Sequence, residues 1–370
     1  MNSDWWRHFH TRRRLLAALA SAAPSALAQS TTYHSPLTPF AEVTPGRTLR
    51  FPRDHGSHPD FRIEWWYITG LLDARAGPLG FQLTFFKARP EHDSTNPSRF
   101  TPRHILIAHA ALTDPRKQRL LHRQRVARAG FGLAQAAEER TAVWIDGWRL
   151  EQTRDGYRMQ LPFEDFGYQF ELRTTQSPML NGDRGYSRKG PRPESASYYY
   201  SLPQLAVSGV VSYDGREERV NGKAWLDHEW SSSYLDERAQ GWDWIGINLD
   251  DGGALMAFRI RGRDGARFWA GATLRSAAGA MRTYAPQDVE FTATREWQSA
   301  RTGARYPVAW RVAIGRAHYD IVPLMDDQEQ DARSTAGTVY WEGAVELLQS
   351  GKRTGAGYLE LTGYWRKLKL

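Results

Sequence analysis

The sequence contains no cysteine among its 370 residues. This absence excludes disulfide bonds, thiolate nucleophiles, iron–sulfur clusters and cysteine-ligated zinc. No run of about 20 apolar residues follows the N-terminal segment, so we expect no membrane-spanning segment in the mature chain. The net charge of +8 is spread along the chain in short basic stretches, which argues against a nucleic-acid partner.

The N-terminal residues 1–28 have the pattern of an export signal. Paired arginines and two leucines at residues 12–16 precede an alanine-rich stretch, and Ala26 and Ala28 are the small residues expected before a cleavage point. The arginine pair is typical of a twin-arginine signal, although an ordinary secretory signal fits the same stretch. We therefore expect a periplasmic or secreted protein, cleaved after about Ala28.

Aromatic residues are abundant, with 15 Trp, 16 Tyr and 15 Phe. Beyond residue 40 the apolar pattern has mainly a period of two, and Asp-Gly pairs separate the segments, as antiparallel hairpins require. The pattern predicts an all-β protein of antiparallel strands with few short helices, one of them at residues 130–140. The predicted strands are residues 63–72, 80–86, 105–112, 142–151, 157–161, 169–173, 205–213, 242–249, 254–261, 270–274, 308–314, 338–347 and 358–364.

A weak internal repeat divides the chain. Residues 66–70 (WYITG) match 242–246 (WDWIG) at an offset of 176, and residues 222–226 (GKAWL) match 355–359 (GAGYL) at an offset of 133. We interpret the second block of each copy as the strand that closes a barrel. The repeat predicts two tandem antiparallel β-barrels, residues 34–234 and 235–370. Chance similarity among aromatic strands is the alternative explanation.

Four blocks of the sequence resemble the signature blocks of the AttH/carotenoid hydratase family, also described as hydroxyneurosporene synthase-like proteins or predicted secreted hydrolases. The blocks are FPRDHGSHPDFRIEWWYITG (51–70), GFQLTFF (80–86), AHAALTD (108–114) and AWLDHEWSSS (224–233). The resemblance covers nearly all of the mature chain. It implies two lipocalin-like barrels, in agreement with the repeat.

The resemblance implies two kinds of function. Some members of the family add water to a carbon–carbon double bond of acyclic carotenoids, and fungal relatives hydrate a prenyl group or act on polyenes. Many exported members have no established activity and are encoded near transport components. The family's hydratases are understood to depend on a His-x-Trp pair, which matches His228 and Trp230.

The block at residues 225–230 (WLDHEW) supplies the catalytic candidates. Strand alternation places Asp227 on one face and His228 and Trp230 on the other. In a low-dielectric interior a histidine stays neutral, whereas the pKa of an aspartate rises and it can hold a proton near neutral pH. Both states suit proton transfer. We therefore propose Asp227, His228 and Trp230 as catalytic candidates. A hydrogen-bonded corner that ties loops together is the alternative.

Water addition to an isoprenoid double bond requires an acid, one positioned water and aromatic faces that stabilise a carbocation. The aromatic candidates also suit an ordinary barrel core. His109 lies on an otherwise apolar strand face, which is more typical of a histidine in a protein core than of a catalytic one. Gln82 would supply a polar group in a ligand cavity. The predicted substrate-binding residues are Glu64, Trp65, Trp66, Tyr67, Gln82, His109, Trp242 and Trp244.

The repeat places any chemistry in the first barrel or at the seam between the two. In the second copy, Leu361 aligns with His228 and Gln240 aligns with Glu64, so the ionisable groups are missing there. A cluster of metal-ligand types at residues 54–60 has no recognised spacing, so we expect no metal and no other cofactor. No Gly-x-Ser-x-Gly motif supports a serine hydrolase.

The sequence supports two candidate functions. One is a carotenoid 1,2-hydratase-like hydro-lyase that acts on a long apolar isoprenoid, carotenoid or lipid. The other is a non-catalytic periplasmic carrier of a hydrophobic ligand, associated with an ABC-type transporter. The enzyme predicts Asp227 or His228 on a buried cavity of the first barrel beside Trp230. The carrier predicts an apolar cavity with these residues at its rim.

Overall fold

The computed structural model describes residues 39–91, 98 and 100–368, which belong to one compact unit. The predicted signal at residues 1–28 lies outside the described residues. Among the described residues, no helix has the length and apolar character needed to cross a bilayer.

The first half of the chain forms a 13-stranded antiparallel sheet, whose main path runs β4-β3-β2-β1-β13-β12-β9-β8-β7-β6-β5, with β10 and β11 paired to β12. Its strands are β1 (Ile63–Ala74), β2 (Gly77–Ala88), β3 (Ile105–Thr113), β4 (Leu121–Arg128), β5 (Ala134–Ala136), β6 (Ala142–Ile145), β7 (Trp148–Gln152), β8 (Gly156–Leu161), β9 (Phe166–Arg173), β10 (Met179–Leu180), β11 (Tyr186–Arg188), β12 (Ala196–Tyr213) and β13 (Arg216–Ser231).

The second half forms a 10-stranded antiparallel sheet in the order β17-β16-β15-β14-β23-β22-β20-β19-β18, with β21 paired to β22. Its strands are β14 (Ala239–Leu249), β15 (Ala254–Gly262), β16 (Arg267–Arg275), β17 (Met281–Tyr284), β18 (Val289–Gln298), β19 (Arg305–Ile314), β20 (Ala317–Pro323), β21 (Glu329–Ala332), β22 (Thr338–Gln349) and β23 (Lys352–Leu361). The helices of the described residues are three 3₁₀ turns, η1 (Arg53–His55), η2 (Pro115–Lys117) and η3 (Pro286–Asp288).

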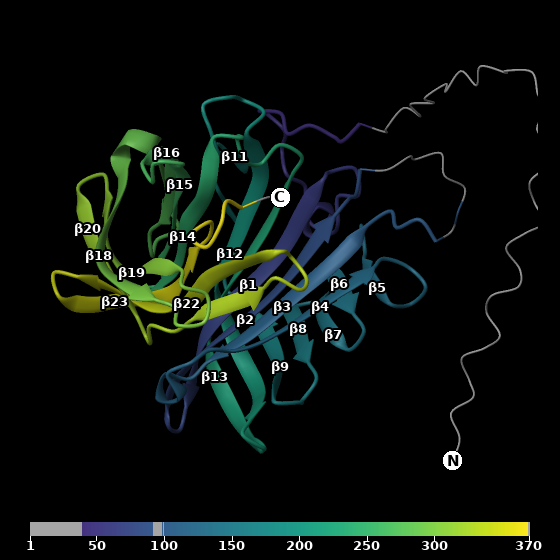
Figure 1. The fold of residues 1–370 in the computed structure, drawn as a ribbon, viewed down its shortest axis with the longest axis horizontal. Coiled ribbons are helices and arrows are strands. Elements are labelled where there is room, and N and C mark those ends of the chain that lie inside the picture. The colour runs from purple at the N-terminus through teal and green to yellow at the C-terminus, as the bar shows by residue number, and fades with distance from the viewer. Residues whose placement is uncertain (1–38, 92–97, 99, 369–370) are drawn as a thin grey trace, which may run out of the picture. The chain divides into compact units, whose positions relative to one another are not determined.

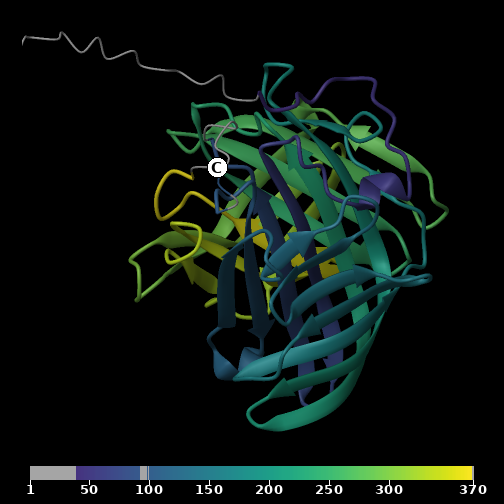
Figure 2. The ribbon, with the colours of Figure 1, turned by 90° about the vertical axis from the view of Figure 1, so that its right-hand side faces the viewer.

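Both sheets contain the same connection (Figure 1). In each, four consecutive strands form a meander, and the last strand of the sheet returns to pair with the first, so that β13 pairs with β1 and β23 pairs with β14. Figure 2 shows the strands of the first sheet, purple to teal, lying side by side and strongly curled. The predicted all-β fold of two lipocalin-like units with few short helices is confirmed. The predicted boundary at residues 234 and 235 falls between β13 and β14, and the division into two domains stays a prediction.

Strand pairing corrects the alignment of the internal repeat. Tyr67 pairs with Asp227 in the first sheet, and Trp244 pairs with Glu360 in the second. The equivalent of Tyr67 is therefore Trp244, one residue further along than the offset of 176 gave. A slip of one residue exchanges the two faces of a strand.

The offset of 133 is unchanged, so Leu361 still aligns with His228, and the corrected equivalent of Glu64 is Gly241. The second copy therefore has no ionisable residue at either place, but it keeps an acid, Glu360, at the position of Asp227.

Two local predictions were wrong because of turns. The helix predicted at residues 130–140 does not form, because Gly130, Phe131 and Gly132 have φ angles of 100°, 56° and 74°, in the left-handed region that a right-handed helix cannot use. The strand predicted at residues 142–151 is a hairpin of β6 and β7, because Asp146 (φ 53°) and the following glycine make a tight turn.

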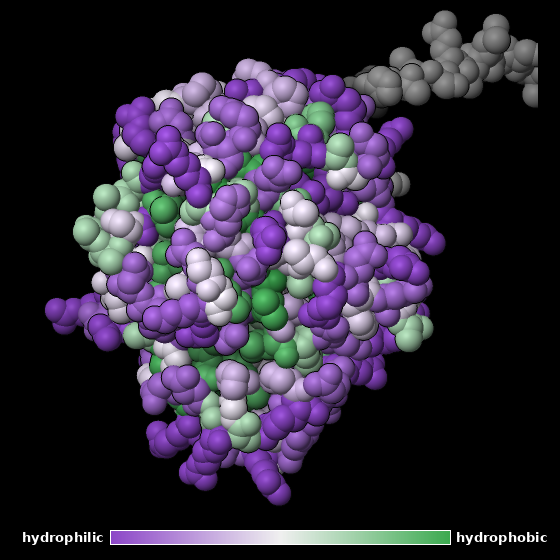
Figure 3. All heavy atoms as spheres, turned by 90° about the vertical axis from the view of Figure 1, so that its left-hand side faces the viewer, coloured by the Kyte–Doolittle hydropathy of each residue, from purple (hydrophilic) through white to green (hydrophobic). Residues whose placement is uncertain are grey.

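Three large clusters of buried apolar residues form most of the core. The interior of the first sheet includes Trp66, Leu83, Phe85, Leu226 and Trp230. The interior of the second includes Ile245, Ile247, Trp310, Trp341 and Leu359. The third cluster lies between the sheets and includes Tyr67, Trp225, Trp244, Phe258 and Tyr358. We call this layer the seam. By contrast, the face in Figure 3, seen from the left of Figure 1, is mainly hydrophilic, with hydrophobic residues showing between.

Candidate functional site

A cavity of about 240 Å³ lies in the seam and is lined by residues of both sheets. Alternation along β1 turns Trp65 and Tyr67 toward the second sheet and Trp66 toward the first interior. The volume is below the roughly 300–1,000 Å³ of drug-sized ligand sites. The cavity therefore suits a compact ligand, or one end of a longer one. Its aromatic walls are Trp65, Tyr67, Phe86, Trp242, Trp244 and Phe258.

Five carboxyl groups line this cavity: Glu64 from β1, Asp227 and Glu229 from β13, Glu342 from β22 and Glu360 from β23. Burial raises the pKa of Asp227 and of Glu360 to about 7. Burial also raises the pKa of Glu229, and burial with the nearby charge of Glu360 raises that of Glu342 well above its usual value. Because a low dielectric disfavours the charged form, Asp227 and Glu360 can hold protons near neutral pH.

Asp227 is fixed by three donors. Its Oδ1 accepts hydrogen bonds from Ser201 Oγ at 2.6 Å and from Trp225 Nε1 at 2.7 Å. Its Oδ2 accepts one from Tyr199 Oη at 2.6 Å, and that hydroxyl accepts a hydrogen bond from Trp244 Nε1 of the second sheet at 3.0 Å. The carboxyl is therefore held in one orientation on the cavity wall by donors of the first sheet, and Trp244 links one of them, Tyr199, to the second sheet.

A buried lysine neutralises the neighbouring acid. Lys189 Nζ lies 2.9 Å from Glu229 Oε1, and both side chains are almost completely buried. Ser197 Oγ donates to the same carboxylate oxygen. Burial lowers the pKa of Lys189, and the charge of Glu229 opposes that effect. The ammonium also lies 4.3 Å from the centre of the Phe258 ring, so an aromatic face completes its surroundings.

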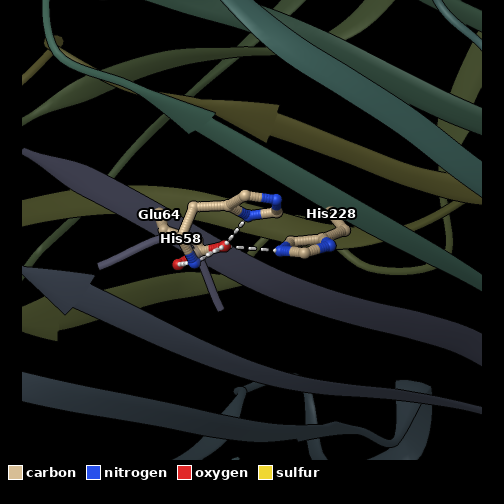
Figure 4. Close-up of side chains that lie close together, drawn as sticks. All are labelled: His58, Glu64 and His228. Atoms are coloured by element: carbon tan, nitrogen blue, oxygen red, sulfur yellow. Dashed lines mark hydrogen bonds and ion pairs between the residues drawn. The ribbon is translucent and has the colours of Figure 1, made fainter. Parts of the chain in front are cut away.

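A second polar cluster lies inside the first sheet (Figure 4). Glu64 Oε1 lies between two imidazoles, 2.7 Å from His58 Nδ1 and 2.9 Å from His228 Nε2, while Lys87 Nζ is 2.5 Å from Oε2. Burial alone would raise the pKa of Glu64, but Lys87 and the histidines hold it well below its ordinary value. Burial lowers the pKa of His228 to about 4. Glu64 and Lys87 also line the cavity, so this cluster supports its wall.

The ligand atoms of His58, Glu64 and His228 lie within 4.8 Å of one another, which raises the question of a metal ion. Zinc requires its nitrogen and oxygen ligands at about 2.0–2.2 Å around a common centre. Here the carboxylate oxygen itself occupies the point between the two ring nitrogens, and an ammonium group is 2.5 Å from the same carboxylate. The arrangement is one of hydrogen bonds. The expectation of no metal stays a prediction.

The structure separates the sequence-predicted residues into two groups. Those that line the cavity are Glu64, Trp65, Tyr67, His109, Asp227, Trp242 and Trp244. Trp66, His228 and Trp230 lie in the first interior, where His228 stacks on Trp66 with ring centres 4.8 Å apart. Gln82 is buried and donates to Thr84 on the cavity wall. The cavity that carries Asp227 is therefore between the sheets, not beside Trp230 as the enzyme hypothesis predicted, because neighbouring residues of one strand face opposite sides.

Sequence reasoning missed several polar residues of the cavity. Glu360 had a detectable signal, because the offset of 133 aligns it with Asp227. Glu342 is a single charge between Trp341 and a glycine in an apolar strand, which is unusual unless the group has a role. Lys189 had no comparable signal, because it follows the short β11 in a segment without clear periodicity.

Comparison with known proteins places the chain in a family. The AttH-like family model matches residues 42–364. The crystal structure of a candidate AttH from Nitrosomonas europaea is 52% identical, with 88% of this chain and all of that chain covered and a TM-score of 0.83. No curated protein is detectably similar to the chain in sequence.

Two more distant structures share the fold. Kievitone hydratase from Nectria haematococca is 14% identical, with 89% of this chain and 99% of that chain covered and a TM-score of 0.65. CghA, crystallised with Sch210972, is 13% identical, with 83% and 89% covered and a TM-score of 0.51. The family model, which spans most of the chain, and the 52% identical structure together show that this protein belongs to the AttH-like family.

Proposed function

We propose that the seam cavity binds an apolar, unsaturated ligand and adds water to its carbon–carbon double bond by acid catalysis. The observation that carries the proposal is Asp227, a buried carboxyl with a pKa of about 7 on the wall of an aromatic cavity. A carboxyl group that is protonated near neutral pH can act as a general acid. The fold is also the one that kievitone hydratase has.

The reaction requires three steps that the cavity can support. The carboxylic acid transfers its proton to one alkene carbon, which leaves a carbocation on the other. Aromatic faces such as those of Trp65 and Trp242 stabilise that cation by about 0.5–2 kcal/mol each when desolvated. A water molecule then forms the new carbon–oxygen bond, and its surplus proton returns to the carboxylate. No group is oxidised or reduced, and the acid is regenerated.

The size of the cavity restricts the ligand. At about 240 Å³ it takes a compact isoprenoid, or the end of a long carotenoid- or lipid-like chain. His228 and Trp230 do not contact this space, and we propose that they position Glu64 and the wall that it supports. Export to the periplasm and a transporter partner remain part of the proposal, resting on the N-terminal pattern and on the family resemblance.

A carrier without catalysis is the second candidate. One observation favours it: both oxygens of Asp227 already have donors, and Glu229 is neutralised by Lys189. A wall whose charged groups are satisfied without a ligand is what a passive apolar pocket requires. In this case Asp227 joins the two sheets and transfers no proton.

The first prediction separates the two candidates through Asp227→Asn, which keeps the shape of the side chain and removes its acidity. The hydratase requires water addition to small isoprenoid alkenes to fall by about 10²–10⁴-fold, while alkene affinity, measured by tryptophan fluorescence, stays within about twofold of wild type.

Asp183→Asn is the matched control, because Asp183 is exposed on the surface. Equal rates of water addition in wild type and Asp227→Asn would remove the hydratase proposal. Tight alkene binding by wild type without any product supports the carrier.

A further inference from the structure

A row of apolar side chains leads out of the seam cavity along the outer face of the first sheet. Trp65 of β1 pairs with Phe86 of β2, which pairs with Ile107 of β3. Ile107 pairs in turn with Val126 of β4. Directly paired residues lie on the same face of an antiparallel sheet. The first three residues line the cavity, whereas Val126 is 50% exposed, so the row begins at the cavity and ends on the surface.

A second row runs beside the first. Ile63 pairs with Ala88, which pairs with Ile105. Ile105 pairs with Arg128 of β4, on the same face of that strand as the end of the first row. Ile63 and Ala88 line the cavity, and the three apolar residues of this row are partly exposed. We call the apolar residues of these two rows the strip.

The strip ends beside a group of exposed apolar side chains. The guanidinium of Arg128 lies 4.6 Å from the centre of the Phe131 ring, and that ring stacks on Phe100 with ring centres 5.7 Å apart. Phe100, Phe131 and Leu133 are 75%, 61% and 52% exposed. We call these three residues the tip. The tip and the strip together form one apolar surface that is continuous with the cavity.

The backbone at Phe131 is unusual. This residue has a φ angle of 56° and lies between Gly130 and Gly132, whose φ angles are also positive. A bulky residue rarely adopts this left-handed conformation, and such conformations are concentrated at functional sites. An unfavourable backbone angle and an exposed ring therefore coincide in one residue, which the stability of the fold alone does not explain.

Positive charge lies beside the tip. Arg128 contacts Phe131, and Arg103 is exposed in the segment that leads from the tip into β3. Asp146, whose backbone N–H donates to Leu133, forms an ion pair with Arg125. Exposed aromatic rings beside basic side chains match the boundary between lipid acyl chains and anionic headgroups.

Two further observations select a lipid bilayer as the partner. Contiguous exposed apolar surface marks sites for proteins or membranes, and this surface leads into a cavity suited to apolar ligands, which partition into lipid. A second copy of the chain is less suited. The outermost strand here, β4, carries Arg123, Arg125 and Arg128, and charges on an edge strand oppose pairing with another chain.

We propose that the tip and the strip form a docking surface for an anionic phospholipid bilayer. The rings of the tip enter the acyl boundary, Arg103 and Arg128 meet the phosphate groups, and the cavity mouth faces the lipid. The proposal does not depend on whether the cavity hydrates its ligand or only carries it, because in both cases an apolar ligand must reach the cavity.

Because the chain has no cysteine, one introduced cysteine places a fluorophore at a single position. Leu133→Cys, labelled with the fluorophore NBD, reports on the tip, and labelled Val126→Cys reports on the strip. Met281→Cys is the matched control, because Met281 is an exposed apolar residue of β17 in the second sheet. The labelled proteins are mixed with vesicles of phosphatidylcholine and phosphatidylglycerol, with and without brominated acyl chains.

We expect the emission at positions 133 and 126 to shift to the blue and to be quenched by brominated lipid, while position 281 stays unchanged. No shift at position 133, or equal shifts at 133 and 281, overturns the proposal. A shift at 133 without one at 126 overturns the part of the strip in docking. A shift that grows with protein concentration in the absence of vesicles would identify a second copy as the partner and also overturn it.

Substitutions at the tip test the source of the affinity. Phe100→Ser combined with Phe131→Ser should lower the vesicle partition coefficient of the protein labelled at position 133 by about 10–100-fold, because two rings no longer enter the lipid. Arg103→Gln should lower it by about fivefold on vesicles with phosphatidylglycerol and hardly at all on phosphatidylcholine alone. Met281→Ser should stay within about twofold of wild type. Undiminished partitioning of the double phenylalanine variant overturns the proposal.

Discussion

The Glu64 carboxylate is completely buried and receives donors from three separate segments of the chain. His58 donates from its backbone and from its ring, His228 donates from β13, and Lys87 forms an ion pair from β2. Such a group adds little net stability compared with an apolar core, but removing one partner leaves the others buried and uncompensated. The residues of the cluster therefore contribute to stability as a unit, and replacing one of them should change the effect of replacing another.

Glu64→Gln should lower the free energy of unfolding by about 3–5 kcal/mol, because it leaves the Lys87 ammonium buried without a counter-charge. Denaturant unfolding measures this change. Glu346→Gln, whose side chain is 40% exposed, should stay within about 0.5 kcal/mol of wild type. Adding Lys87→Met to Glu64→Gln should recover part of the loss. A Glu64→Gln protein as stable as wild type would contradict this description of the cluster.

At the scale of elements, the contact between the two sheets depends on a small residue. Gly80 of β2 faces the second sheet, and a Cβ atom placed on it would lie 2.7 Å from the Cβ of Ala344 and 2.7 Å from the hydroxyl oxygen of Tyr358. The first of these atoms cannot rotate away. A glycine here lets the sheets approach closely enough to form the seam.

Gly80→Ala should therefore destabilise the protein by about 1–3 kcal/mol, as overpacking does in a dense interior. Ala344→Gly removes the opposing methyl group, so the double variant should be more stable than the sum of the two single changes predicts. Thermal or denaturant unfolding of the four proteins gives the interaction free energy. If the changes in the free energy of unfolding were strictly additive, residues 80 and 344 would not be in steric conflict.

The elements themselves were largely predictable, because a period of two and Asp-Gly turns are local signals. The separation of Asp227 from His228 also followed from alternation alone. What the sequence could not show is which strand face meets the other sheet, since that depends on how the sheets pack. Glu342 and Lys189 reach the cavity through such packing. Glu360 could have been found from the sequence, because the offset of 133 aligns it with Asp227.

At the scale of the whole molecule, buried ionisable groups make stability depend on pH in opposite directions. Burial lowers the pKa of His228 and His55 to about 4 and that of His109 to about 3. The folded state binds their protons less readily than the unfolded state, so they reduce stability as pH falls from about 6.5. The raised pKa values of Asp227 and Glu360 act oppositely, reducing stability as pH rises toward 7.

His109→Gln isolates one of these contributions. The amide can still bond to Tyr340, whose hydroxyl lies 2.7 Å from His109 Nδ1, but it cannot take up a proton. Between pH 6.5 and pH 5 the wild type should lose about 2 kcal/mol more unfolding free energy than the variant. Denaturant curves at the two pH values measure the difference. Parallel losses in both proteins would mean that His109 is not the buried neutral group described here.

The central claim is that the ligand site lies in the seam and not inside either sheet. A crystal structure with a brominated isoprenoid tests this most directly, because the anomalous signal of bromine locates the ligand without interpretation of its shape. We predict a bromine peak against Trp242, Trp244 or Phe258 on the cavity wall. A peak in the first interior against Trp66 and Trp230 would contradict the account, as would no bound ligand at saturating concentration.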